Sequence, residues 1–136
     1  MEIILAENHG FCYGVKRAVE MANEAADSDG KSYTLGPIIH NPQVVGRLES
    51  KGVSPIQEVA DIDEGTMIIR SHGVGPAIYE EAEEKGLNIL DATCPHVKKA
   101  QQDAKSVIED GMTLVILGEK NHPEVKSINL SLIHIS

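Results

Sequence analysis

The segment TMIIRSHGVGPAIYEEAEEKGLNILDATCP, residues 66–95, decides the fold of this chain. An apolar run at 66–70 precedes a helical pattern at 75–86, and a second apolar run follows at 88–92. Short strands that alternate with helices of about 10–15 residues are typical of βαβ units, whose strands are parallel. The segment therefore predicts an α/β fold built on a parallel sheet.

The same alternation continues on both sides of this segment. Apolar runs predict further strands, and amphipathic stretches predict further helices. The strands are expected at 2–5, 32–36 and 113–118, and the helices at 15–26, 41–52, 95–111 and from the HPEV sequence at 122–125 onward. Asn41 at the cap position, Pro42 after it and Gly52 beyond the end mark one of these helices clearly. We expect the crossovers to be right-handed.

Composition narrows the functional class. The chain has 136 residues, of which 41% are hydrophobic, and a formal net charge of −9. The acidic balance argues against nucleic acid as a partner, because such binding needs a basic face. No apolar run reaches the roughly 18 residues that span a membrane, and the start of the chain lacks the features of a secretion signal. We therefore predict a cytoplasmic protein without a membrane partner. Its two cysteines are too few for a disulfide scaffold.

The residues that can carry chemistry share one position in the pattern, between a predicted strand and the next helix. They are Cys12, His40, His72, Cys94, His122 and Glu124. In open α/β sheets this edge is where ligands bind, and helix N-termini there favour anions. Each residue alone could simply cap a helix. One shared site explains all of these loops together, so we expect the side chains to form one cluster.

The cysteines indicate what the cluster could bind. The start of a helix favours the thiolate, which is a metal ligand and a nucleophile. Closely spaced cysteine pairs of the zinc type are absent. Cysteines on separate loops suit an iron–sulfur cluster held where several units meet. Two cysteines do not complete such a site, so a further ligand is required.

Five motifs in order are recognisable: GFCYGVKRAV, IIHNPQVV, SHGVGP, DATCPHV and GEKNHPEV. Together they resemble the signature of the 4-hydroxy-3-methylbut-2-enyl diphosphate reductases, iron–sulfur oxidoreductases of the non-mevalonate isoprenoid pathway. The resemblance covers Met1 to about Ser127. It implies three α/β domains in pseudo-threefold arrangement, of which this chain would hold the first, at 1–92, and part of the second, at 93–127.

The resemblance also implies a cofactor, a reaction and residue roles. One 4Fe–4S cluster would take a cysteine from each domain, and the first two match Cys12 and Cys94. Reductive dehydration of (E)-4-hydroxy-3-methylbut-2-enyl diphosphate would give isopentenyl and dimethylallyl diphosphate, with electrons from a donor such as ferredoxin or flavodoxin. The substrate-binding histidines match His40, His72 and His122, and the catalytic proton donor matches Glu124.

The end of the chain departs from the family pattern. We expect the helix after Pro123 to lose its pattern near Asn129, and residues 128–136 to be a tail foreign to the family, in which His134 has no role. A third cysteine is absent, so this chain alone is expected to be inactive.

Two other functions remain open at this point. One is an enzyme similar to quinolinate synthase, which also uses three domains and three cysteines around a cluster. The other is a non-catalytic module that binds a metal or an anion, in which Glu124 would be dispensable.

Overall fold

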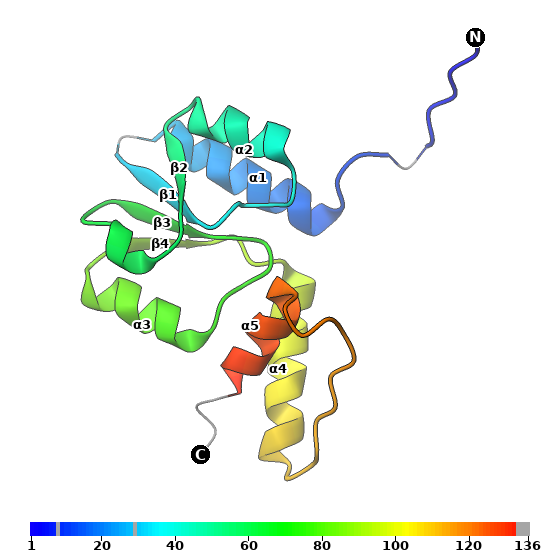
Figure 1. Cartoon of the computed structure of the whole chain (residues 1–136), viewed down its shortest axis with the longest axis vertical. Helices are drawn as coiled ribbons and strands as arrows, with labels where there is room; N and C mark the ends of the chain where they lie inside the picture. The colour runs from blue at the N-terminus through cyan, green and yellow to red at the C-terminus, as the bar shows by residue number, and fades with distance from the viewer. Residues whose placement is uncertain (8, 29, 133–136) are drawn as a thin grey trace.

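The computed structural model describes residues 1–7, 9–28 and 30–132 (Figure 1). Helices and strands alternate along most of this range. In chain order they are α1 (Tyr13–Ala26), β1 (Ser32–Leu35), α2 (Pro42–Glu49), β2 (Val53–Ile56), the 3-10 helix η1 (Val59–Asp61), β3 (Thr66–Ile69), α3 (Pro76–Glu84), β4 (Asn88–Asp91), α4 (Pro95–Glu109) and α5 (Pro123–Ser131). The predicted helices are therefore present, with ends that differ by a few residues.

The strands form one parallel sheet in the order β2-β1-β3-β4. Helices α1 and α2 lie on one face of the sheet and α3 on the other (Figure 1). Side chains of β3 alternate between the two cores: Ile68 packs under α1 and α2, and Met67 and Ile69 pack on the α3 side. All three are fully buried. The predicted α/β fold with a parallel sheet is confirmed.

The start and the end of α2 follow the local rules. Asn41 accepts a hydrogen bond from the backbone N–H of Val44 at 3.1 Å, and Pro42 fills the first helical position. Gly52 follows the helix with a φ of +92°, a conformation that favours glycine. This helix carries the chain from the end of β1 back to the start of β2.

Strand β2 was not predicted from the sequence. Pro55 lies in it and cannot donate a backbone hydrogen bond, which argues against a central strand. The structure resolves the conflict, because among the described strands β2 lies at the edge of the sheet and pairs with β1 alone. At an edge, one proline is tolerated when its missing N–H faces away from the neighbour.

Two predicted strands are wrong in this structure. Residues 2–5 and 113–118 form no strand, and Figure 1 shows the N-terminal segment running away from the body of the molecule. In the second segment Leu114 and Ile116 are half-buried, whereas Val115 and Leu117 are 74% and 94% exposed. That alternation is typical of a strand with one covered face, yet a strand forms only where a neighbour supplies hydrogen bonds.

The C-terminal part consists of α4 and α5, which pack against each other below the sheet (Figure 1). Helix α5 continues to Ser131, two residues beyond the position where its pattern was expected to fade. The remaining residues of the predicted tail, 133–136, include His134 and lie outside the described range. Within the described ranges, no helix is long and apolar enough to cross a membrane.

Candidate functional site

Three of the predicted site residues lie on neighbouring loops at the carboxyl edge of the sheet. His40 follows β1, His72 follows β3, and Cys94 follows β4. Backbone hydrogen bonds continue beyond the strands. The N–H of Cys94 donates to the carbonyl of Ser71 at 2.9 Å, and the N–H and hydroxyl of Ser71 donate to the carbonyl of Ile38 at 3.4 and 3.3 Å. The pairing that orders the strands therefore also holds these loops in register.

The three candidate histidines lie close together although they come from three separate segments. The ring centroids of His40 and His72 are 4.5 Å apart, and those of His72 and His122 are 6.2 Å apart. His122 is the N-cap of α5, and its Nδ1 accepts a hydrogen bond from the backbone N–H of Glu124 at 3.3 Å. With Nδ1 engaged as an acceptor, Nε2 is the ring nitrogen of His122 that can donate to another group.

His72 lies at the centre of the histidine cluster and is only 7% exposed. Burial lowers its pKa most strongly, followed by the positive field of His40, Arg70 and His122, and together they bring the pKa to about 4. The ring is therefore neutral near pH 7. Its Nδ1 is buried without a hydrogen-bond partner among the described residues. A buried polar atom left unpaired is unfavourable, so this ring suits a partner from outside the chain.

The two cysteines each stand at the start of a helix. Cys12 is the N-cap of α1 and Cys94 is the N-cap of α4, and neither thiol makes a capping hydrogen bond. Both are free, with Cys12 exposed and Cys94 half-buried. The Sγ of Cys94 lies directly against Gly14, where an added methyl group would overlap it. Because Gly14 is two residues from Cys12, the two cysteine-bearing segments lie side by side.

The cysteines fit part of an iron–sulfur ligand set. Thiolates are the ligands that such clusters take, and helix N-termini favour the thiolate form. Among the described residues, no group of three or more Cys, His, Asp and Glu side chains could hold a metal ion. Two thiols of the right kind are therefore present, and a cluster bound here would need its remaining ligands from outside the described part of the chain.

Glu124 lies in the first turn of α5 with an exposed side chain. Its backbone is engaged locally: the N–H donates to His122, and the carbonyl accepts from the hydroxyl of Ser127 at 2.8 Å. These contacts fix the first turn of the helix. The side chain itself is exposed, two residues along the chain from His122 of the histidine cluster.

The sequence analysis did not identify Asp91, which holds the loop before Cys94. Its carboxylate accepts from the backbone N–H of Thr93 at 2.9 Å and from the hydroxyl of Tyr79 at 3.0 Å, and it pairs with Lys98 at 2.6 Å. Burial acts to raise the pKa of Asp91, but hydrogen bonds from Lys98, Thr93 and Tyr79 outweigh it and lower the pKa. Burial, with Asp91 nearby, raises the pKa of Tyr79 to about 12. The sequence signal that could have identified Asp91 is its place at the end of a predicted strand, three residues before Cys94 in DATCP.

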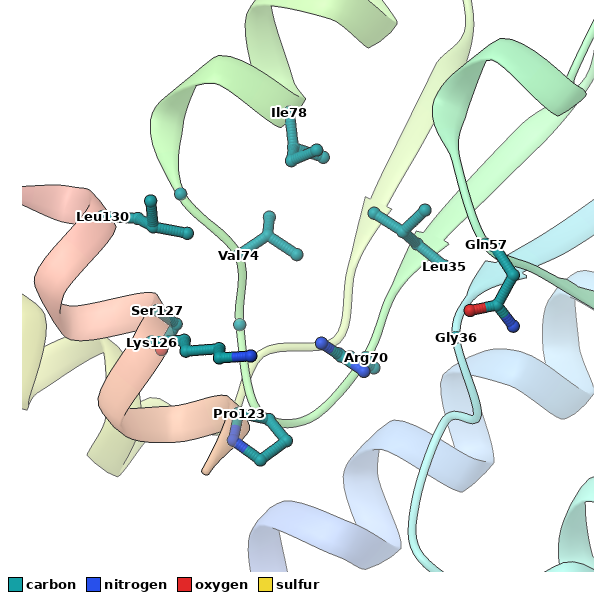
Figure 2. Close-up of a pocket in the computed structure, with 12 residues that line it drawn as sticks. Leu35, Gly36, Gln57, Arg70, Val74, Ile78, Pro123, Lys126, Ser127 and Leu130 are labelled. Atoms are coloured by element: carbon teal, nitrogen blue, oxygen red, sulfur yellow. The ribbon is translucent and has the colours of Figure 1, made fainter. Parts of the chain in front are cut away.

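A separate cavity of about 260 Å³ lies between the ends of β1 and β3 and helix α5. Figure 2 shows the side chains of Arg70 and Lys126 pointing toward each other in it. Burial lowers the pKa of Arg70. One wall of the cavity is Leu130, which belongs to the predicted tail. None of the candidate histidines or cysteines lines this cavity, so the candidate site, built on the histidine and cysteine loops, does not include it.

Comparison with known proteins gives one family. The family model described as LytB protein matches residues 3–132 of this chain. The match includes the first five residues of the predicted tail, 128–132. It also covers every candidate site residue named above.

Curated relatives and solved structures agree with this family. The chain is 56% identical to the 4-hydroxy-3-methylbut-2-enyl diphosphate reductase of Geotalea uraniireducens and 55% identical to that of Geobacter sulfurreducens. Each alignment spans 128 residues, which are 94% of this chain and 45% of the relative. A solved structure of (E)-4-hydroxy-3-methyl-but-2-enyl diphosphate reductase, described as the terminal enzyme of the non-mevalonate pathway, aligns with a TM-score of 0.85 at 51% identity, over 96% of this chain and 47% of that chain. The corresponding reductase structure from Plasmodium falciparum gives 0.89 at 33% identity, over 94% and 41%. The chain thus spans about half the length of the relatives that it matches.

Proposed function

The chain belongs to the LytB protein family, and from this premise we propose that it is the N-terminal part of a 4-hydroxy-3-methylbut-2-enyl diphosphate reductase. The complete protein would convert (E)-4-hydroxy-3-methylbut-2-enyl diphosphate to isopentenyl and dimethylallyl diphosphate. The resemblance read from the five sequence motifs is confirmed at the level of the family. The reaction itself remains a proposal, because about half of the relatives' length is absent from this chain.

The observation that carries the proposal is the convergence of His40, His72 and His122 from three loops. A diphosphate needs several hydrogen-bond donors, and helix N-termini next to those donors favour its negative charge. The neutral state of His72 gives a donor without a fixed charge, and its unpartnered Nδ1 shows that the ring has unused hydrogen-bonding capacity. We propose that the three rings bind the diphosphate group of the substrate.

Cys12 and Cys94 would hold two of the three thiolate positions of a 4Fe–4S cluster. When bound, such a cluster supplies electrons and an iron site that can accept an oxygen ligand. The part played by this chain is to place both thiols at helix starts beside the histidine loops. Free cysteines and an oxygen-sensitive cofactor fit a reducing compartment, so we propose a cytoplasmic location, with ferredoxin or flavodoxin as the electron donor.

We propose that Glu124 donates a proton from its carboxyl group during loss of the substrate hydroxyl. In this chain the side chain is exposed, so any burial that favours its protonated form has to come from the rest of the complete protein or from the substrate. The hydrogen bond between its backbone N–H and His122 fixes the position of Glu124 relative to the proposed diphosphate site. This links proton donation to substrate binding.

We retain residues 1–92 and 93–127 as the proposed first domain and the proposed start of a second domain. Residues 128–136 remain a proposed tail, and the family match reaches into this segment as far as residue 132. The third cysteine would come from sequence that is absent from this chain. Alone, the chain would then be inactive.

The proposal is tested on the complete parent protein, purified without oxygen. We expect a brown protein with iron and sulfide in equal amounts, and loss of both the colour and the metal in Cys12→Ser and Cys94→Ser, because each change removes a ligand. His96→Ala is the matched control, because His96 is exposed on the first turn of α4 and should not affect the cluster. A Cys94→Ser protein with full iron content and an unchanged spectrum would contradict the assignment.

Replacement of Glu124 separates an enzyme from a binding module. Glu124→Gln keeps the shape of the side chain but removes the proton, so turnover of the complete protein should fall by about 10²–10⁴-fold while cluster content is retained. Normal turnover of Glu124→Gln would mean that the proton comes from another source, whereas absence of turnover in the unchanged complete protein would support the non-catalytic module. The other enzyme reading, an enzyme similar to quinolinate synthase, has no support from the relatives described above, which carry the reductase name.

A further inference from the structure

We propose that Arg17 is a positioning residue that sets the separation of the Cys12 and Cys94 thiols. It does so by fastening the helix that carries Cys12 to the loop that carries Cys94. The inference rests on the proposed function, in which both thiols bind one cluster. It adds a residue whose hydrogen bonds go to backbone carbonyls and that the sequence analysis did not select.

The first observation is a pair of hydrogen bonds between distant parts of the chain. Arg17 lies one turn into α1, and its Nη1 and Nη2 donate to the carbonyls of Thr93 and Asp91 at 3.2 and 3.4 Å. Both carbonyls belong to the segment that leads directly into Cys94. A planar guanidinium with several fixed donors can hold two backbone carbonyls at once.

The second observation is the close approach at Gly14. Gly14 and Arg17 are three residues apart and lie on the same face of α1, which is the face turned toward the Cys94 loop. The Sγ of Cys94 occupies the space beside Gly14 that a larger side chain would need. Ala18, next to Arg17, is fully buried. The small residues let α1 approach, and Arg17 supplies the polar contact across the interface.

The third observation is that the Cys94 loop has its own support on the other side. The side chain of Asp91 receives hydrogen bonds from Thr93 and Tyr79 and an ion pair from Lys98, none of which involves α1. Loss of Arg17 should therefore leave the loop in place. What it removes is a tie between that loop and α1, whose Cys12 end follows residues 9–11, which form no helix or strand.

The test uses this chain and a bifunctional thiol reagent, because its two cysteines make the bridged product unambiguous. Dibromobimane becomes fluorescent once it has reacted with both thiols. For Arg17→Ala we expect the bridging rate to fall by about 10–100-fold, since intramolecular rates depend steeply on the positions of the reacting groups. Labelling of each single thiol by monobromobimane should change far less.

Two further variants keep the test decisive. Arg17→Lys retains the charge but has one ammonium in place of a fork, so its bridging rate should be intermediate. Lys16→Ala is the matched control, because Lys16 is exposed on the same turn of the helix and should bridge at the original rate. Arg17→Lys is also the deciding variant if Arg17→Ala does not fold.

The proposal is overturned if folded Arg17→Ala, or folded Arg17→Lys in its place, bridges at the original rate. It is equally overturned if monobromobimane labels both cysteines faster in the variant by a factor as large as the change in the bridging rate. That result would indicate that the whole chain has loosened, and not that the two thiols alone have moved apart. The assay contains no iron. Failure here is therefore distinct from failure of the cluster assignment, which the Cys94→Ser variant of the complete protein decides.

Discussion

Two sets of apolar runs in this chain look alike in sequence and differ in structure. TMII in β3 and NILD in β4 form paired strands in the centre of the sheet and at its edge. The runs EIIL at 2–5 and TLVILG at 113–118 are similarly apolar but form no strand within the described part of the chain. The difference teaches that a strand is specified by its neighbours as much as by its own residues, because each strand needs a partner for its backbone groups.

The same difference extends to the candidate site. His72 and Cys94 follow paired strands and are buried or half-buried. Cys12 and Glu124 come after the unpaired runs, and both are exposed. The parallel holds for these four residues only: His40 follows the paired strand β1 and is exposed, and His122 follows the second unpaired run and is half-buried. Pairing of the preceding strand therefore does not by itself decide the exposure of a site residue.

The largest expected effect compares the same substitution in the two sets. Met67→Ala in β3 removes a fully buried side chain between two paired neighbours, and we expect the free energy of unfolding to fall by about 2–5 kcal/mol. Met112→Ala borders the second unpaired run, where the side chain is 53% exposed, and should change it by less than about 0.5 kcal/mol. Urea unfolding followed by circular dichroism measures both. Equal losses would remove the distinction.

The second prediction concerns the effect of pH on stability through His72, which follows the paired strand β3. The folded chain holds the pKa of His72 at about 4, whereas an unfolded histidine titrates near 6.5. Between these values the unfolded chain binds a proton that the folded chain does not. Stability should therefore fall as the pH is lowered from 6.5 to 4, by up to about 3 kcal/mol.

A matched variant isolates this histidine. His72→Gln should flatten the pH dependence of stability in that window, while His9→Gln, at an exposed position, should leave it unchanged. The Asp91 carboxyl titrates below this window, because its pKa is lowered from 3.8, so its loss of stabilisation comes at lower pH. If the dependence of stability on pH between 4 and 6.5 were unchanged in His72→Gln, His72 would not be held neutral by burial.

These contrasts also show what the sequence could predict. Helix starts such as Asn41-Pro42 were predictable because the cap and the proline act locally. The meeting of His40, His72 and Cys94 followed from a general property of parallel sheets, whose carboxyl ends share one edge. The order of the strands, the edge position that tolerates Pro55, and the absence of partners for 2–5 and 113–118 depend on contacts between distant residues, which local patterns do not contain.

The third prediction tests the contact that joins the two cysteine-bearing segments. Gly14→Ala would place a methyl group on Cys94 Sγ, and we expect it to lower the free energy of unfolding by about 1–3 kcal/mol and to speed labelling of Cys94 by iodoacetamide. Gly46→Ala is the matched control, because Gly46 lies in α2 with open space around it. It should stabilise the chain by up to about 1 kcal/mol. A neutral Gly14→Ala would mean that α1 is not docked on this loop.

The smallest expected effect is the most direct test of the unpaired runs. Ile4 is 83% exposed and Leu117 is 94% exposed, so Ile4→Ser and Leu117→Ser remove little buried apolar surface. We expect each to change the free energy of unfolding by less than about 0.5 kcal/mol. Exposed apolar strand-like segments can pair with those of other molecules, so both variants should also remain monomeric to higher concentration in analytical ultracentrifugation. A loss of about 2 kcal/mol or more from either change would show that the run is buried in solution, since burial of one aliphatic side chain contributes that much, and the contrast with β3 would then disappear.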